Sequence, residues 1–149
     1  MTWKPNCDFT GDSVDDIAID AADDVVADSI ATNPTLAYAH LVYTTRSGGF
    51  YIRQWNGVAW TEATQLRLEP TFAQSLAAGL TLSAGLRVLL ASPGGGLRMV
   101  LYTSGYWTYR AVTLVDSLVD DVSMSALADG SMYAALRTRD NRILTNAVY

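Results

Sequence analysis

The chain has 149 residues, of which 50% are hydrophobic and 17% charged, and its formal net charge is −5. These values are typical of one folded domain and exclude a disordered tail. The negative charge argues against sequence-independent nucleic-acid binding, which needs a basic face. The sequence also contains no secretory signal pattern and no apolar run long enough to span a membrane. We therefore expect no nucleic-acid partner and no membrane insertion, and the cellular location stays open.

The kinds of charged residue point to strands and turns. Thirteen of the fifteen acids are Asp and nine of the ten bases are Arg. Asp favours turns and caps, whereas Glu and Lys, which fill exposed helix faces, are scarce. Cys7 is the single cysteine, so no disulfide forms within the chain and the redox compartment is undetermined.

In chain order, residues 1–12 resemble the stretch that leads into the last repeat, and we expect them to form an isolated outer strand. Residues 13–66 then form a first unit, with strands expected at 16–20, 36–45, 50–55 and 60–66. Its long connection is predicted to hold a short helix capped by Asp20, with Val25, Val26 and Ile30 facing inward.

Residues 67–114 form a second unit, with strands expected at 77–83, 86–92, 97–102 and 106–114. Its glycine-rich stretch at residues 93–96 lies between two strands and is interpreted as a hairpin loop. Residues 115–149 form a third unit, with strands at 122–128, 131–137 and 142–149 and no outer strand. A repeat of about 45 residues with four strands is the signature of a β-propeller blade.

The predicted fold is therefore all-β, with three four-stranded propeller blades in a single half-propeller domain. Three blades cannot close a ring, and an open module would leave two apolar faces and a strand edge exposed. We expect a homodimer that closes a six-bladed ring, in which residues 1–12 of each chain complete the third blade of the other. A nine-bladed trimer, or a chain that is a fragment of a longer one, would also satisfy the pattern.

The motif Trp55-Asn56-Gly57-Val58-Ala59-Trp60 resembles the blades of bacterial and phage sialidase-like propellers and of fucose-binding propeller lectins. The second unit repeats it as Tyr102-Thr103-Ser104-Gly105-Tyr106-Trp107. The resemblance places His40, Arg87 and Met132 where fucose lectins carry a sugar-binding Arg, and Ile52 and Met99 where they carry Glu. A sialidase-type Asp box is absent.

The candidate ligand-binding residues are aromatic and basic side chains of the first two units, because aromatic faces suit the C–H face of a sugar and guanidinium groups bind its hydroxyls or a carboxylate. The alternative is that the aromatic residues only pack one blade on the next. The candidates are Trp55, Trp60, Arg53, Arg87, Tyr102 and Trp107, with Tyr106, Tyr109 and Arg110 near them.

No catalytic, cofactor or metal site is predicted. The Asp pairs 15–16 and 120–121 are interpreted as caps and turns, His40 as a structural histidine, and no nucleophile or phosphate-binding motif is present. The leading hypothesis is a non-catalytic binding or assembly module, such as an accessory component of a virion or cell surface. The alternatives are a lectin with glycan pockets between blades, and a sialidase-like glycan hydrolase.

Overall fold

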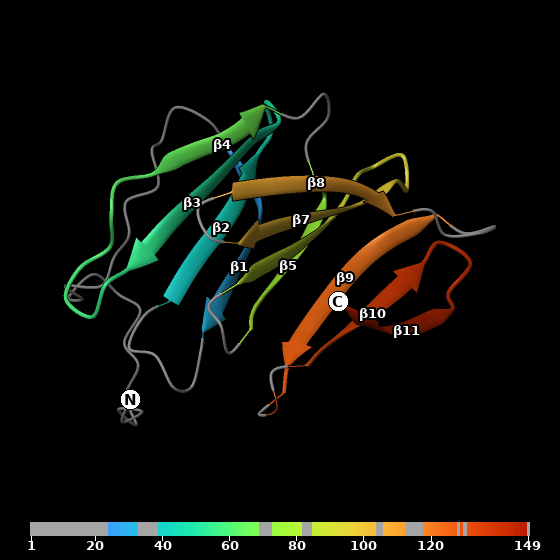
Figure 1. Ribbon diagram of the computed structural model, residues 1–149. Helices are drawn as coiled ribbons and strands as arrows, with labels where there is room; N and C mark the ends of the chain where they lie inside the picture. The colour runs from blue at the N-terminus through green and yellow to red at the C-terminus, as the bar shows by residue number, and fades with distance from the viewer. Residues whose placement is uncertain are drawn as a thin grey trace, which may run out of the picture.

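The computed structural model describes residues 24–32, 39–68, 73–81, 85–103, 106–112, 118–127, 129 and 131–148. These residues form three antiparallel sheets, and the described part of the chain contains no helix, hence none that could cross a membrane (Figure 1). The strands of the first sheet are β1 (Val25–Thr32), β2 (Ala39–Thr45), β3 (Gly49–Trp55) and β4 (Thr64–Leu68). Those of the second are β5 (Ser75–Leu80), β6 (Leu86–Ala91), β7 (Leu97–Thr103) and β8 (Tyr106–Val112). The third sheet contains β9 (Val119–Ala126), β10 (Met132–Thr138) and β11 (Ile143–Val148).

Each sheet is a meander, in which consecutive strands pair in chain order. The all-β class and the grouping of strands into three small sheets confirm the sequence prediction. The third sheet has three strands among the described residues, with β11 at its edge. Residues 1–12, which are predicted to supply a fourth strand, lie outside the described residues, and the division of the chain into three blades stays a prediction.

The prediction for the start of the first sheet was wrong. Residues 25–32 form a strand and not the capped helix, and β1 pairs with β2 in the place that was assigned to residues 16–20. The small residues Ala27, Ser29 and Ala31 of β1 alternate with Asp28, Ile30 and Thr32, which are exposed. The strand therefore packs through small side chains, and it lacks the alternation of large apolar and polar residues that indicates a half-buried strand.

The turn between the second and third strands has one design in all three sheets. A Thr or Ser carbonyl accepts from the N–H three residues later, in the pairs Thr45–Gly48, Ser92–Gly95 and Thr138–Asn141. The three residues that donate have positive φ angles, of 93°, 79° and 61° respectively. Glycine suits that backbone region best and Asn is one of the few other residues that adopt it readily, so the turn chemistry explains the sequence at these positions. The turn at residues 92–96 is the predicted hairpin loop.

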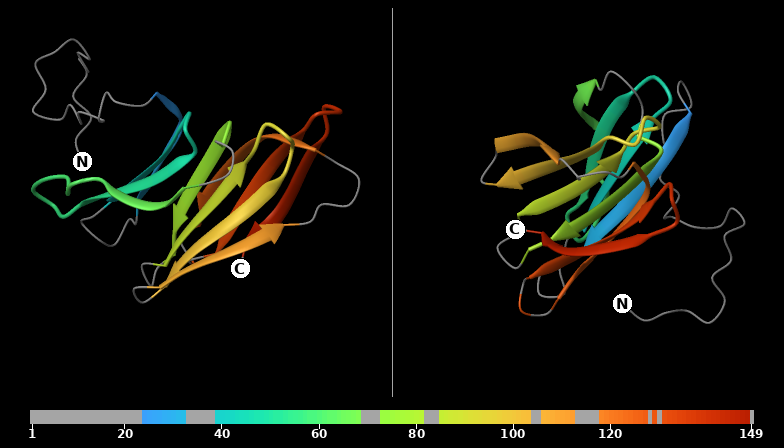
Figure 2. Two further views of the ribbon diagram at one scale, coloured as in Figure 1. Left: turned by 90° about the horizontal axis from the view of Figure 1, so that it is seen from above. Right: turned by 90° about the vertical axis from the view of Figure 1, so that its right-hand side faces the viewer.

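These turns give a common numbering to the three sheets, because each Thr or Ser stands at the end of its second strand or directly after it. Every residue of a sheet can then be matched with one in the next, and each sheet has two faces. In the first and second sheets, we call the face that points to the following sheet the forward face. In the third sheet, the forward face is the one that carries the equivalent residues. The opposite face of each sheet is the backward face. Figure 2 shows the three sheets side by side, each stacked on the next.

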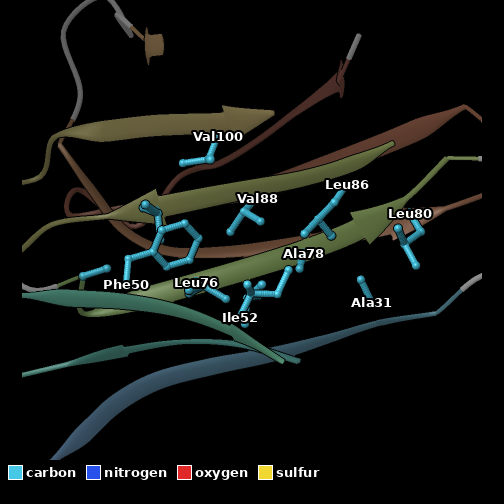
Figure 3. Packing of buried hydrophobic residues seen from close by; sticks show 12 residues of the cluster. Ala31, Phe50, Ile52, Leu76, Ala78, Leu80, Leu86, Val88 and Val100 are labelled. Carbon is cyan, nitrogen blue, oxygen red and sulfur yellow. The ribbon is translucent and has the colours of Figure 1, made fainter. Parts of the chain in front are cut away.

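The forward face of the first sheet and the backward face of the second enclose one hydrophobic core (Figure 3). Its largest fully buried side chain is Phe50, and Leu76, Val88 and Val100 of the second sheet belong to the same core. The Thr44 hydroxyl donates to the Ala73 carbonyl oxygen at 3.2 Å at one end of this core.

The forward face of the second sheet and the backward face of the third enclose a second core, which contains Leu89, Leu97, Val122, Ala134 and Leu136. The second sheet is thus buried on both faces, which explains its near-continuous apolar strands.

Hydrogen bonds between innermost strands join each pair of sheets. The Ala78 N–H of β5 donates to the Ser29 hydroxyl of β1, and the Val122 N–H of β9 donates to the Ser75 hydroxyl of β5, both at 3.1 Å. Arg139 also links the third sheet to the second. Its guanidinium group donates one hydrogen bond to the Asp120 carboxylate and another to the Pro93 carbonyl oxygen.

Candidate functional site

The Trp55–Trp60 pair is held by a tight hairpin between β3 and β4. The Asn56 side-chain oxygen accepts from the Val58 and Ala59 N–H groups, both at 3.0 Å, and Gly57 has a φ of 96°. This turn brings the two indole rings to a centroid distance of 5.8 Å with a tilt of 54°. Both indoles are half-buried, so part of each ring contacts solvent.

The Tyr102–Trp107 pair occupies the same place in the second sheet, 47 residues later. Tyr102 and Trp107 are cross-strand partners with ring centroids 4.5 Å apart. They pack against the core between the first and second sheets, yet both are only half-buried. The repeat therefore builds two aromatic pairs, one inside a sheet–sheet junction and one on the backward face of the first sheet.

The structure separates the two predicted arginines. Arg53 lies two residues before Trp55 on β3 and so on the same face of the first sheet, whereas Arg87 lies on the forward face of the second sheet, away from Tyr102. The Nε of Arg87 is buried, and no hydrogen bond to it is found in the described part of the structure. The side chain of Arg110 lies outside the described residues.

The forward face of the first sheet, which closes the same junction as the Tyr102–Trp107 pair, carries a polar pair that the sequence did not reveal. The His40 and Gln54 side chains, on facing residues of β2 and β3, are 2.9 Å apart. Burial lowers the pKa of His40 from its ordinary value of 6.5, so the ring is neutral near pH 7. Only the strand register reveals Gln54 as the partner of His40.

The position equivalent to His40 and Arg87 in the third sheet is Tyr133, and not Met132 as predicted. Tyr133 pairs with Ala147 as Arg87 pairs with Leu101, and each stands five residues before the Thr or Ser of the turn. Met132 is instead buried and reaches Gly79, where a Cβ atom would lie 2.7 Å from its sulfur.

The carboxyl groups with shifted pKa values among the described residues lie in exposed turns. No group of three His, Cys, Asp or Glu side chains that could hold a metal ion occurs within the described ranges. The Asp129 carboxyl has its pKa lowered chiefly by the Ser131 hydroxyl, and Asp140 has its pKa lowered chiefly by the Thr138 side chain. Both are exposed turn residues, whereas a general acid at neutral pH needs a raised pKa.

Comparison with solved structures finds similar chains, among them the following two. One is a fucose lectin from Kordia zhangzhouensis in complex with methyl-fucoside, at 15% identity over 81% of this chain and 91% of the lectin chain, with a TM-score of 0.49. The other is the intramolecular trans-sialidase from Ruminococcus gnavus in complex with oseltamivir carboxylate, at 14% identity over 78% of this chain and with a TM-score of 0.50. This chain spans 30% of the trans-sialidase chain.

No protein-family model and no curated protein matches the sequence. The likeness to the trans-sialidase is one of fold: the chain has a β-propeller-type arrangement of sheets, as the Trp-Asn-Gly-x-x-Trp motif predicted. At this level of identity it does not transfer a ligand or an activity.

Proposed function

We propose that the protein is a non-catalytic binding module of β-propeller type whose ligands are carbohydrates. The observation that carries this proposal is the repeated, half-buried aromatic pair, Trp55–Trp60 and Tyr102–Trp107. An aromatic ring that is partly exposed and held in place by its own hairpin offers a flat apolar surface to a sugar ring at little entropic cost.

One further feature supports a polar ligand beside the Tyr102–Trp107 pair. His40 and Gln54 supply donors and acceptors on the forward face of the first sheet, which closes the same junction from the other side. Without a carboxyl pair at these positions, binding is better supported than hydrolysis.

We propose in addition that two copies close a six-bladed ring, with residues 1–12 of each copy adding a fourth strand along the β11 edge of the other. The third sheet has room for such a strand, because β11 pairs on one side only among the described residues. Ring closure would make the module an assembly unit as well as a binding one.

A glycan array followed by calorimetry tests the binding function. We expect specific glycan binding that Trp107→Ala and Trp60→Ala each weaken at least tenfold at one class of site, and that Trp107→Phe largely retains. Tyr106→Ala is the matched control, because Tyr106 is 78% exposed and, as the neighbour of Trp107, faces the opposite side of β8. A folded protein that binds no glycan, or binding that survives both Trp→Ala changes, would refute the proposal.

A further inference from the structure

One position on the third strand carries a large apolar residue in every sheet. Phe50, Leu97 and Ile143 are equivalent, since each pairs with the residue just before the Thr or Ser of the turn. Phe50 is 0% exposed and Leu97 is 5% exposed, because a following sheet covers each of them. Ile143 is 64% exposed, on a forward face that no described residue covers.

On the backward face of the first sheet, β1 shows the complementary exposure, whereas Leu41 and Tyr43 of β2 on the same face are buried. Ile30 of β1 is equivalent to Ala78 of β5 and Met124 of β9, which pack in the two cores. Ile30 is 55% exposed, and its neighbours on this face of β1, Asp28 and Thr32, are exposed too. The first sheet thus presents an innermost strand whose counterparts are covered in both other sheets.

We infer that these two exposed surfaces bind each other between copies: the forward face of the third sheet docks on β1, the exposed part of the backward face of the first sheet, in a second copy. This inference rests on the proposed ring closure and names the surfaces that achieve it. We assign a second copy of the chain as the binding partner, because a forward face meets a backward face in both junctions inside the chain. Repeat proteins bury their faces in this nearest-neighbour manner.

The two junctions inside the chain also indicate the contacts of the new one. Ser123 of β9 is exposed and equivalent to Ser29, whose hydroxyl accepts from the Ala78 N–H. In the docked pair, the Ser123 hydroxyl therefore accepts from the N–H of the partner's Ile30. Tyr133 and Ile143, the two large apolar side chains exposed on the third sheet's forward face, become covered.

Charge complementarity favours the same arrangement. Arg137 is exposed and stands at the place of Thr44, which contacts Ala73 just before the innermost strand of the next sheet. The corresponding place on a second copy is just before β1, where Asp24 is exposed and its carboxylate lies 3.4 Å from the Arg46 Nε of its own chain. Arg137 of one copy would share this carboxylate with Arg46 of the other, which helps to fix the register of the two copies.

Paired cysteines test the inference, in a Cys7→Ser background. The Ser29 hydroxyl and the Ala78 nitrogen are 3.1 Å apart, which places their Cα atoms within about 7 Å, close enough for a disulfide. Ser29→Cys with Ala78→Cys is therefore the control, and it should cross-link within one chain. Ser123→Cys with Ile30→Cys should instead cross-link two chains, giving twice the mass of the chain on a non-reducing gel.

Variants with only one of the two introduced cysteines provide further controls. Ser123→Cys alone and Ile30→Cys alone should each stay uncross-linked, and a mixture of the two should yield the two-chain product. If the control pair closes while the Ser123–Ile30 pair stays single-chain, or if either single variant cross-links to itself, the inference is wrong.

Light scattering provides a second measurement that does not depend on disulfides. We expect a mass of two chains for the wild type and for Val58→Asp, which alters an apolar residue that is 85% exposed on the β3–β4 hairpin. Ile143→Asp should reduce the mass to one chain. A single-chain wild type, or an undiminished mass for folded Ile143→Asp, would overturn the inference.

Glycan binding distinguishes this inference from the binding function. The Tyr102–Trp107 pair lies at a junction within one chain, so a monomeric Ile143→Asp variant should still bind there. A dimer that binds no glycan would refute the binding function and leave the docking surfaces standing.

Discussion

Gly95 is the position where a single methyl group should do most damage to the junction between the second and third sheets. Its φ is +79°, and a Cβ atom there would lie 2.4 Å from the Cβ and 2.9 Å from the Cα of Leu118. Its carbonyl oxygen also accepts from the Val119 N–H at 3.2 Å, so the backbone cannot move away without losing a bond between sheets.

Two costs add for Gly95→Ala. A left-handed backbone costs an alanine about 1–2 kcal/mol, and forcing an atom into a filled space costs about 1–3 kcal/mol. The free energy of unfolding should therefore fall by about 2–5 kcal/mol, a large part of the roughly 5–15 kcal/mol that stabilises a typical domain.

Urea denaturation followed by tryptophan fluorescence measures this loss. The matched control is Gly94→Ala, because a Cβ at Gly94 meets nothing within 4 Å. It should change the unfolding free energy by less than about 0.5 kcal/mol. If Gly95→Ala is as stable as Gly94→Ala, the packing of Leu118 against the turn is not as described and the reasoning fails.

Two further predictions concern the junction between the first and second sheets. Phe50→Ala empties the centre of its core and should cost about 3–5 kcal/mol in urea denaturation, whereas Val58→Ala, at an exposed site, should cost almost nothing; equal stabilities would contradict the core assignment. Because burial lowers the pKa of His40, the unfolded chain binds this proton more tightly than the folded one. The stability that His40 contributes is therefore full above pH 6.5 and is lost as the pH falls from there through the folded-state pKa. Urea midpoints at pH 7.5 and pH 5.0 should drop further for the wild type than for His40→Gln, and identical drops would show that the histidine is not buried neutral.

The aromatic pairs were predictable because their signal is local. Trp55 and Trp60 flank an Asn-Gly turn, and the 47-residue spacing to Tyr102 and Trp107 carries the pattern into the second sheet. Turn chemistry and spacing of this kind determine strand boundaries to within a few residues, since glycine and asparagine are needed at particular φ angles.

The start of the first sheet could not be predicted in this way. β1 contacts the second sheet through Ala27, Ser29 and Ala31, and small side chains give no hydrophobic period. The same limit applies to the position equivalent to His40 in the third sheet. The prediction of Met132 in place of Tyr133 is an error of one residue, and neighbouring residues of a strand point to opposite faces of the sheet. Which side of a junction a residue occupies, as for Arg87, follows from register, and register depends on pairing between strands.

The second sheet, buried on both faces, also determines how the chain comes apart. Each sheet gains its tertiary contacts from its immediate neighbours, so cooperativity passes along the row of sheets and not through one shared centre. Within one chain, loosening the first or the third sheet removes one core, whereas loosening the second removes both. Amide protons of β6 should thus exchange only when the whole row opens, while those of β4 and β11 exchange through local fraying.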